Sequence, residues 1–210
     1  MPSLCVVSQI PTVMANFYFL TGPKSPGPRS PWGDYSSILI RGMAAHLPRK
    51  DGLIQLERTG PYIPPISFPG LTIVVTNGFR QALESSGLAG AKFQPVIKKH
   101  IVHLDWQTWD LSAKKPAEYP EGGAPAGYIL DRPHSPETSA EMGDLWELLA
   151  DQGATSQETE EGFALIETSW RGTDFFRLDN RRVMCITEKA KRWLEEHVAE
   201  HVHISELPVG

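Results

Sequence analysis

One C-terminal stretch decides the expected fold: it reads VMCITEKAKRWLEEHVAEH and spans residues 183–201. Its first four residues are apolar, which predicts a buried strand. Thr187 follows in the N-cap position of a helix, where its hydroxyl can accept a hydrogen bond from an unpaired backbone N–H group. Apolar residues then recur at helical spacing over residues 188–201, and residues 202–205 return as a short strand. The stretch therefore predicts a strand–helix–strand unit.

A second stretch repeats this order earlier in the chain. Residues 72–76 read as a strand that ends in Thr76, residues 77–86 as a helix and residues 91–96 as a strand. We interpret the two stretches as related units, each with a helix packed on a sheet. The alternative is coincidence, because a strand followed by a capped helix is common. Together the two stretches predict an α+β fold with a mixed sheet and a few packed helices.

The rest of the chain divides by composition. Fifteen of the 18 prolines lie between Pro23 and Pro136, which predicts a lobe of strands and irregular connections over residues 14–136. Residues 137–210 form a second expected lobe, with an acidic helix followed by the C-terminal unit, although both lobes could be one domain. Residues 1–13 read as an N-terminal extension. Further strands are expected over residues 14–20, 35–41, 53–57, 96–104, 128–130, 163–170 and 175–178.

The acidic helix is expected over residues 137–151, where apolar residues recur at helical spacing. Between Arg132 and Arg171 the chain has no Lys or Arg but nine acidic residues. Eight of them form the candidate partner-binding site, since an acidic face steers and docks a basic partner: Glu137, Glu141, Asp144, Glu147, Asp151, Glu158, Glu160 and Glu161. The alternative is a solvated helix followed by a polar surface loop over residues 153–162.

Charge and composition exclude several classes of protein. The net charge is −5, whereas a protein that binds nucleic acid directly usually has a basic surface. No segment is apolar and long enough to cross a membrane, and no signal peptide is evident at the N-terminus. Cys5 and Cys185 are too few for a disulfide framework, and Cys185 reads as a buried small hydrophobic residue. We expect a cytoplasmic protein.

The best catalytic candidate is the sequence HVAEH at residues 197–201, which matches H-x-x-E-H. His197 and His201 could share a metal ion, His203 could add a ligand, and Glu200 could act as a base. However, the third ligand of such a site usually lies well downstream, and both histidines continue the apolar face of the helix. We therefore expect structural histidines, no metal, no cofactor and no catalytic residues.

Residues 174–178 and 183–194, together with residues 71–76 and 79–83, resemble a pattern in immunity proteins of bacterial polymorphic toxin systems, including relatives of the double-CXXCG proteins. In this chain and in those immunity proteins, a short D-x-F stretch precedes a strand, a Ser or Thr and a helix. The pattern consists of packing residues and covers about a third of the chain. The chain has no CXXCG motif, so the zinc-ribbon part of those relatives is missing. The resemblance implies a cognate toxin that the protein binds and neutralises.

The sequence thus predicts a non-catalytic binding protein of bacterial origin that occludes the active site of a toxin through an acidic surface. Two other functions remain open. One is a metal-dependent hydrolase that uses His197, Glu200 and His201. The other is a structural protein that associates with itself.

Overall fold

The computed structural model describes residues 16–23, 36–110, 113, 125–160, 162–179 and 181–210. It confirms an α+β fold, in which the described strands form sheets of five, four, two and two strands. The expected extension at residues 1–13 lies outside the described residues. None of the described helices is long and apolar enough to cross a membrane.

The C-terminal unit has the predicted order of elements. Strand β12 (Met184–Thr187) leads into helix α5 (Glu188–Val198), and strand β13 (His203–Glu206) follows. The two strands are parallel but not adjacent, because strand β1 (Phe17–Thr21) lies between them and pairs antiparallel with both. The N-terminal strand therefore completes the C-terminal sheet.

The earlier unit is built in the same way. Strand β4 (Val74–Thr76), helix α2 (Asn77–Ser85) and strand β5 (Lys92–Pro95) follow one another. Strand β7 (Leu145–Leu149) lies between β4 and β5 and pairs antiparallel with both. Each unit therefore has two parallel strands, a connecting helix and a central strand from a distant part of the chain. The sheets do not follow the expected boundary between residues 136 and 137.

The edges of the two sheets also correspond. Strand β3 (Ile66–Ser67) pairs antiparallel with β4, and strand β11 (Phe175–Leu178) pairs antiparallel with β12. Strand β8 (Gln152–Ala154) extends the larger sheet beyond β11. The order β3-β4-β7-β5 of one sheet thus matches β11-β12-β1-β13 of the other. This match supports the interpretation of two related units.

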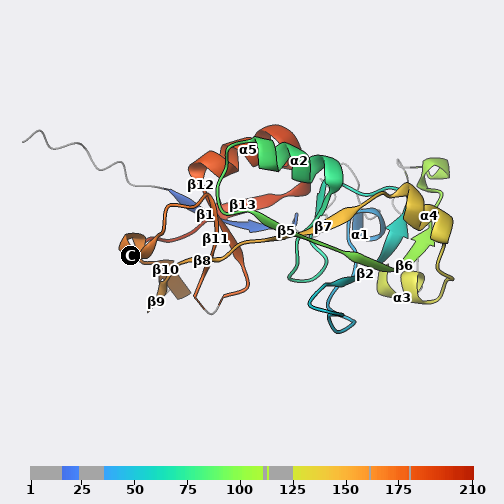
Figure 1. Ribbon diagram of the computed structural model, residues 1–210, viewed down its shortest axis with the longest axis horizontal. Helices are drawn as coiled ribbons and strands as arrows, with labels where there is room; N and C mark the ends of the chain where they lie inside the picture. The colour runs from blue at the N-terminus through green and yellow to red at the C-terminus, as the bar shows by residue number, and fades with distance from the viewer. Residues whose placement is uncertain (1–15, 24–35, 111–112, 114–124, 161, 180) are drawn as a thin grey trace, which may run out of the picture.

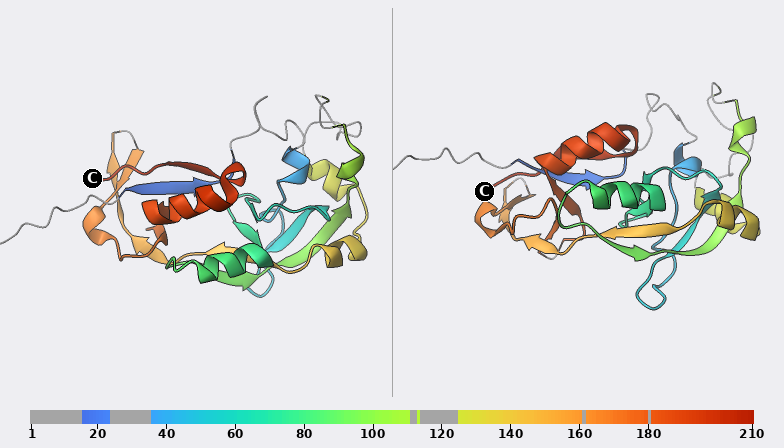
Figure 2. Two further views of the ribbon diagram at one scale, coloured as in Figure 1. Left: turned by 90° about the horizontal axis from the view of Figure 1, so that it is seen from above. Right: turned by 45° about the horizontal axis from the view of Figure 1, so that its top comes forward.

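The two units share one hydrophobic core. Helices α2 and α5 lie next to each other on the same side of the two sheets (Figures 1 and 2). Phe79 of α2 meets Trp193 of α5 edge to face, with ring centroids 5.5 Å apart. The core beneath them takes Leu83 and Leu148 from one unit and Leu194 from the other. Burial of this common apolar surface holds the units together.

Smaller elements extend the molecule at both ends (Figure 1). At one end, strand β2 (Gln55–Gly60) pairs parallel with strand β6 (Ile97–His103), near helices α1 (Ser36–Leu39), α3 (Pro125–Leu130) and α4 (Pro136–Glu141). At the other end, strands β9 (Ser156–Thr159) and β10 (Gly162–Leu165) form an antiparallel pair. Short 3-10 turns span Trp106–Thr108, Glu167–Ser169 and Ala199–His201.

Several local predictions are wrong. The expected strand at residues 35–41 contains α1, whose carbonyl groups at Ile38 and Leu39 accept hydrogen bonds from Thr59 and Arg58 of β2. The expected strand at residues 128–130 is the end of α3. The polar segment 153–162 contains β9 rather than only a loop, and the strand expected at residues 163–170 ends at Leu165.

The expected helix at residues 137–151 is also wrong beyond its first turns. Helix α4 ends at Glu141, Gly143 turns with a φ of 66°, and the chain continues as β7. A positive φ is readily adopted by glycine and interrupts a helix. The apolar spacing of residues 142–149 fits a helix and a buried strand, and pairing of β7 with two neighbours favours the strand.

The contribution of each helix N-cap to the free energy of unfolding can be measured by substitution. Thr76 Oγ1 accepts a hydrogen bond from Phe79 N, and Thr187 Oγ1 accepts one from Ala190 N. Thr187 is buried and also donates to Asp174 Oδ1 over 2.8 Å. We expect Thr76→Ala to lower the free energy of unfolding by about 1 kcal/mol, and Thr187→Ala by about 2 kcal/mol. Urea denaturation measures both.

The matched controls are Thr76→Ser and Thr187→Ser, which keep the hydroxyl and should restore most of each loss. Equal losses for the two alanine variants would show that the bond between Thr187 and Asp174 adds nothing.

Candidate functional site

The structure separates the predicted acidic site into three parts. Glu137, Glu141 and Asp144 are exposed on and just after α4, and we call them the α4 acidic group. Glu147 is buried in β7. Asp151, Glu158 and Glu160 are exposed toward the other end of the molecule, whereas Glu161 lies outside the described residues. The prediction of a single acidic helix face is wrong because the chain changes from helix to strand between these residues.

The carboxylate of Glu147 is surrounded by other side chains of the protein and not by solvent. Its side chain is 3% exposed and accepts hydrogen bonds from both terminal nitrogens of Arg49, over 2.8 and 2.7 Å. Gln94 Nε2 donates a third hydrogen bond over 2.7 Å. The bond to Glu147 raises the pKa of Arg49, and burial of the guanidinium opposes this effect. A buried carboxylate with these partners holds β7 to its surroundings and is not available to a protein partner.

Two of the other exposed acids form ion pairs with neighbours. Asp151 pairs with Lys92 over 2.5 Å and Glu158 with Arg181 over 2.9 Å, at solvent-exposed positions. The α4 acidic group differs, because its three carboxylates form no ion pair within the described residues. Nearby Lys98 instead donates to the carbonyl oxygens of Ser139 and Gly143. Burial lowers the pKa of Lys98, and the charge of Asp144 opposes this effect. Exposed Glu160 also has no ion pair with a described residue, so the α4 acidic group is one of the parts of the predicted site that lack an ion pair.

The histidines of the H-x-x-E-H sequence do not converge. Helix α5 ends at Val198, so His197 and His201 do not share one regular helix face. The His197 ring is exposed and stacks on Trp193 with ring centroids 4.1 Å apart, whereas His201 is buried. His203 lies in β13. In the described part of the chain, no group of three or more His, Cys, Asp or Glu is placed to hold a metal ion.

Burial of the His201 side chain affects its protonation. It lowers the pKa of His201, and neighbouring Glu200 opposes this effect. The unfolded chain then binds a proton near pH 6.5, whereas the folded protein binds it only at lower pH. Since the unfolded state binds more protons, we expect the free energy of unfolding to fall as the pH drops below about 6.5. Urea denaturation at pH 7.5 and 5.0 measures the fall.

His201→Asn should reduce that fall, while the control His203→Asn should keep it. A fall that is the same in the wild type and in His201→Asn would remove His201 as its cause.

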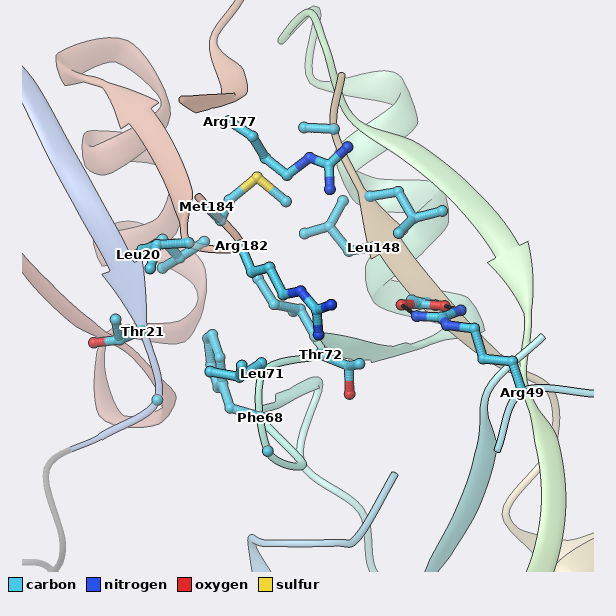
Figure 3. A pocket seen from close by; sticks show the side chains of 17 residues that line it. Leu20, Thr21, Arg49, Phe68, Leu71, Thr72, Leu148, Arg177, Arg182 and Met184 are labelled. Atoms are coloured by element: carbon cyan, nitrogen blue, oxygen red, sulfur yellow. Dashed lines mark hydrogen bonds and ion pairs between the residues drawn. The ribbon is translucent and has the colours of Figure 1, made fainter. Parts of the chain in front are cut away.

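One hollow of the molecule lies between the two units (Figure 3). This interunit pocket has a volume of about 400 Å³. The end of β1, the segment between β3 and β4, the end of β7 and the turn between β11 and β12 surround it. Its lining residues are Leu20, Thr21, Gly22, Arg49, Phe68, Gly70, Leu71, Thr72, Ile73, Glu147, Leu148, Leu149, Ala150, Arg177, Arg182, Val183 and Met184.

The charged groups of the interunit pocket fall into two sets. On one wall, Arg49 and Glu147 satisfy each other. From the β11–β12 side, Arg177 and Arg182 extend into the pocket (Figure 3). Both arginines are exposed, and neither forms a side-chain hydrogen bond or ion pair with any described residue. The pocket therefore combines apolar walls with two uncompensated positive charges.

Sequence reasoning missed this pocket. The sequence patterns assigned no role to Arg177 or Arg182. One local signal was available: Arg177 is a charged residue inside the apolar strand β11, between buried Phe176 and Leu178. The lining polar groups can bind and orient a ligand. Among the described residues that line the pocket there is no His, Cys or Ser that could act as a nucleophile or base.

Cys185 also stays outside any reactive role. It is fully buried in β12, and burial raises its pKa to about 12. A thiol with this pKa is not ionised at neutral pH and is a poor nucleophile. The prediction of a buried Cys185 is confirmed.

The ion pair of Arg49 and Glu147 should contribute to stability. Arg49→Gln leaves the buried carboxylate with Gln94 as its remaining partner, and we expect the free energy of unfolding to fall by about 2 kcal/mol. The double variant Arg49→Met/Glu147→Leu should recover part of this loss, because apolar residues replace both charges. Chemical denaturation at pH 7 compares the variants.

Lys92→Gln is the matched control, since it breaks the exposed pair with Asp151. Its effect should stay within about 0.5 kcal/mol. A loss for Arg49→Gln no larger than that of Lys92→Gln would contradict the role assigned to the buried pair.

A comparison with protein-family models finds no family that matches this chain, and a comparison with curated proteins finds no significant match.

Proposed function

We propose that the protein is a non-catalytic binding protein of the immunity type, which neutralises a cognate toxin in the cytoplasm of a bacterial cell. Support for this class comes from the resemblance of residues 71–83 and 174–194 to such immunity proteins. Those residues include β4, part of α2, β11, β12 and the first part of α5, which build the two units. The resemblance thus concerns the central framework of the fold.

The observation that carries the proposal is the α4 acidic group. Glu137, Glu141 and Asp144 follow one another at spacings of four and three residues, and all three are exposed. Glu137 and Glu141 lie four residues apart in α4, where like charges repel one another, and Asp144 follows just after the helix. The three carboxylates therefore do not stabilise one another. They can instead steer and orient a basic surface of a partner. We therefore assign the partner-binding role to these three residues.

The metal-dependent hydrolase is less well supported. It needs His197, Glu200 and His201 around one ion, but His201 is buried and His197 is exposed and stacks on Trp193. No observation on the described residues favours it over binding.

The first experiment is affinity purification of the tagged protein from its native host, followed by mass spectrometry. The proposal expects one stoichiometric protein partner, a secreted toxin domain that loses its toxicity when the two proteins are expressed together. A purified protein that brings down no stoichiometric partner and fails to protect cells would contradict it.

Charge reversal then tests the α4 acidic group. The triple variant Glu137→Lys/Glu141→Lys/Asp144→Lys should bind the partner at least about tenfold more weakly, mainly through slower association. Surface plasmon resonance at two salt concentrations measures both rates.

The matched control is Asp151→Lys/Glu158→Lys/Glu160→Lys, which makes the same change of charge toward the other end of the molecule. It should keep most of the affinity. Equal weakening by the two triple variants would show a dependence on net charge alone, and no weakening by the first would remove the α4 acidic group as the interface.

A further inference from the structure

The interunit pocket is positively charged in an acidic protein. The chain carries a net charge of −5, whereas the pocket is lined by three arginines and one glutamate. Arg49 is neutralised by Glu147, so the positive charge of the pocket comes from Arg177 and Arg182. A concave, partly apolar site concentrates the field of such charges and attracts anions.

The side chains of Arg177 and Arg182 have no hydrogen-bond or ion-pair partner among the described residues. Arg177 lies in β11, and its side chain is exposed. Its hydrogen bond with Asp151 joins backbone atoms only. Arg182 precedes β12 and is also exposed. Some other surface arginines have side-chain partners, for example Arg181 with Glu158 and Arg192 with Glu188. Arg177 and Arg182 therefore bring two uncompensated positive charges to the pocket.

The apolar part of the pocket includes an exposed leucine. Leu71 is 69% exposed, the highest value among the large hydrophobic residues of the described chain, and it lines the pocket. Phe68 and Met184 continue the apolar surface from Leu71 (Figure 3). Exposure of a leucine beside an apolar hollow is unfavourable in water, and a ligand that covers it would relieve this.

We propose that the interunit pocket binds a small organic anion with an apolar body, that is, a carboxylate, sulfonate or phosphate head joined to an aliphatic or aromatic group. The head pairs with the guanidinium groups of Arg177 and Arg182, which offer planar sets of N–H donors suited to such oxygens. The body lies against Leu71, Phe68 and Met184. A volume of about 400 Å³ falls within the range of small-molecule sites, roughly 300–1,000 Å³.

Such a ligand would also bridge the two units. Arg177, Arg182 and Met184 belong to the unit of β12, whereas Leu71 and Leu148 belong to the unit of β4. A ligand that binds only the folded arrangement of both units stabilises the protein by mass action. Binding should therefore be visible as a rise in the thermal midpoint as well as in a direct titration.

The site is separate from the proposed partner interface. None of the α4 acidic group lines the pocket. Loss of ligand binding in the arginine variants is therefore expected to leave partner binding unchanged, and the two proposals can fail independently.

The experiment titrates the purified chain with decanoate by isothermal calorimetry, below the concentration at which decanoate forms micelles. Two comparators separate the contributions of head and body: decanol has the same chain without charge, and inorganic phosphate is an anion without an apolar body. We expect one saturable site for decanoate, at least about tenfold weaker binding of decanol, and no saturable binding of phosphate over the same range. The thermal midpoint should rise with decanoate in parallel.

Variants assign the binding to the pocket. Arg177→Gln/Arg182→Gln should weaken decanoate at least about tenfold, and Leu71→Ser should weaken it severalfold. These side chains are exposed, so the variants should keep the circular dichroism spectrum and the ligand-free thermal midpoint. Arg192→Gln is the matched control, because it removes an exposed arginine of α5 that does not line the pocket.

Three outcomes would overturn the proposal. The first is no decanoate binding up to millimolar concentrations, and the second is equal binding of decanoate and decanol. The third is equal weakening by Arg192→Gln and by the double arginine variant, which would indicate attraction by surface charge alone. Saturable binding of phosphate with the affinity of decanoate would limit the site to a simple anion and would contradict the role of the apolar walls.

Discussion

The arrangement of the molecule depends on two strands that each complete a sheet in a distant part of the chain. In the C-terminal unit, β12 and β13 are parallel and separated, and β1 supplies the backbone groups that both strands need. In the earlier unit, β7 does the same between β4 and β5. Without these central strands, each unit would leave inner strand edges with unpaired N–H and C=O groups, which is strongly unfavourable in a buried sheet.

This constraint explains why the two units form one body. Because β1 precedes the first unit and pairs within the second, the chain passes from one sheet to the other and back. The two helices then lie over a common core, where Phe79 meets Trp193. The same arrangement brings the ends of β1 and β7 near the turn before β12, and the interunit pocket forms there. The pocket is thus a product of the way the units join.

The candidate sites show which residues a local sequence pattern can identify and which it cannot. The acidic run was evident in the sequence, and three of its residues, Glu137, Glu141 and Asp144, do form an exposed group. Glu147 belongs to the same run but is buried against Arg49, a residue 98 positions earlier. No local pattern distinguishes these two outcomes, because the distinction depends on whether a distant arginine covers the carboxylate. The same reason hid Arg177 and Arg182, whose pocket combines five separate parts of the chain.

The sequence by itself determined the two helices α2 and α5, their threonine N-caps, the strands around them and the α+β class. These features follow from interactions between residues a few positions apart, such as the bond between Thr187 Oγ1 and Ala190 N. Only the tertiary structure decided that residues 145–149 form a strand and that a pocket with uncompensated arginines lies between the units. Those outcomes depend on pairing and burial between segments far apart in the chain, which local spacing does not encode.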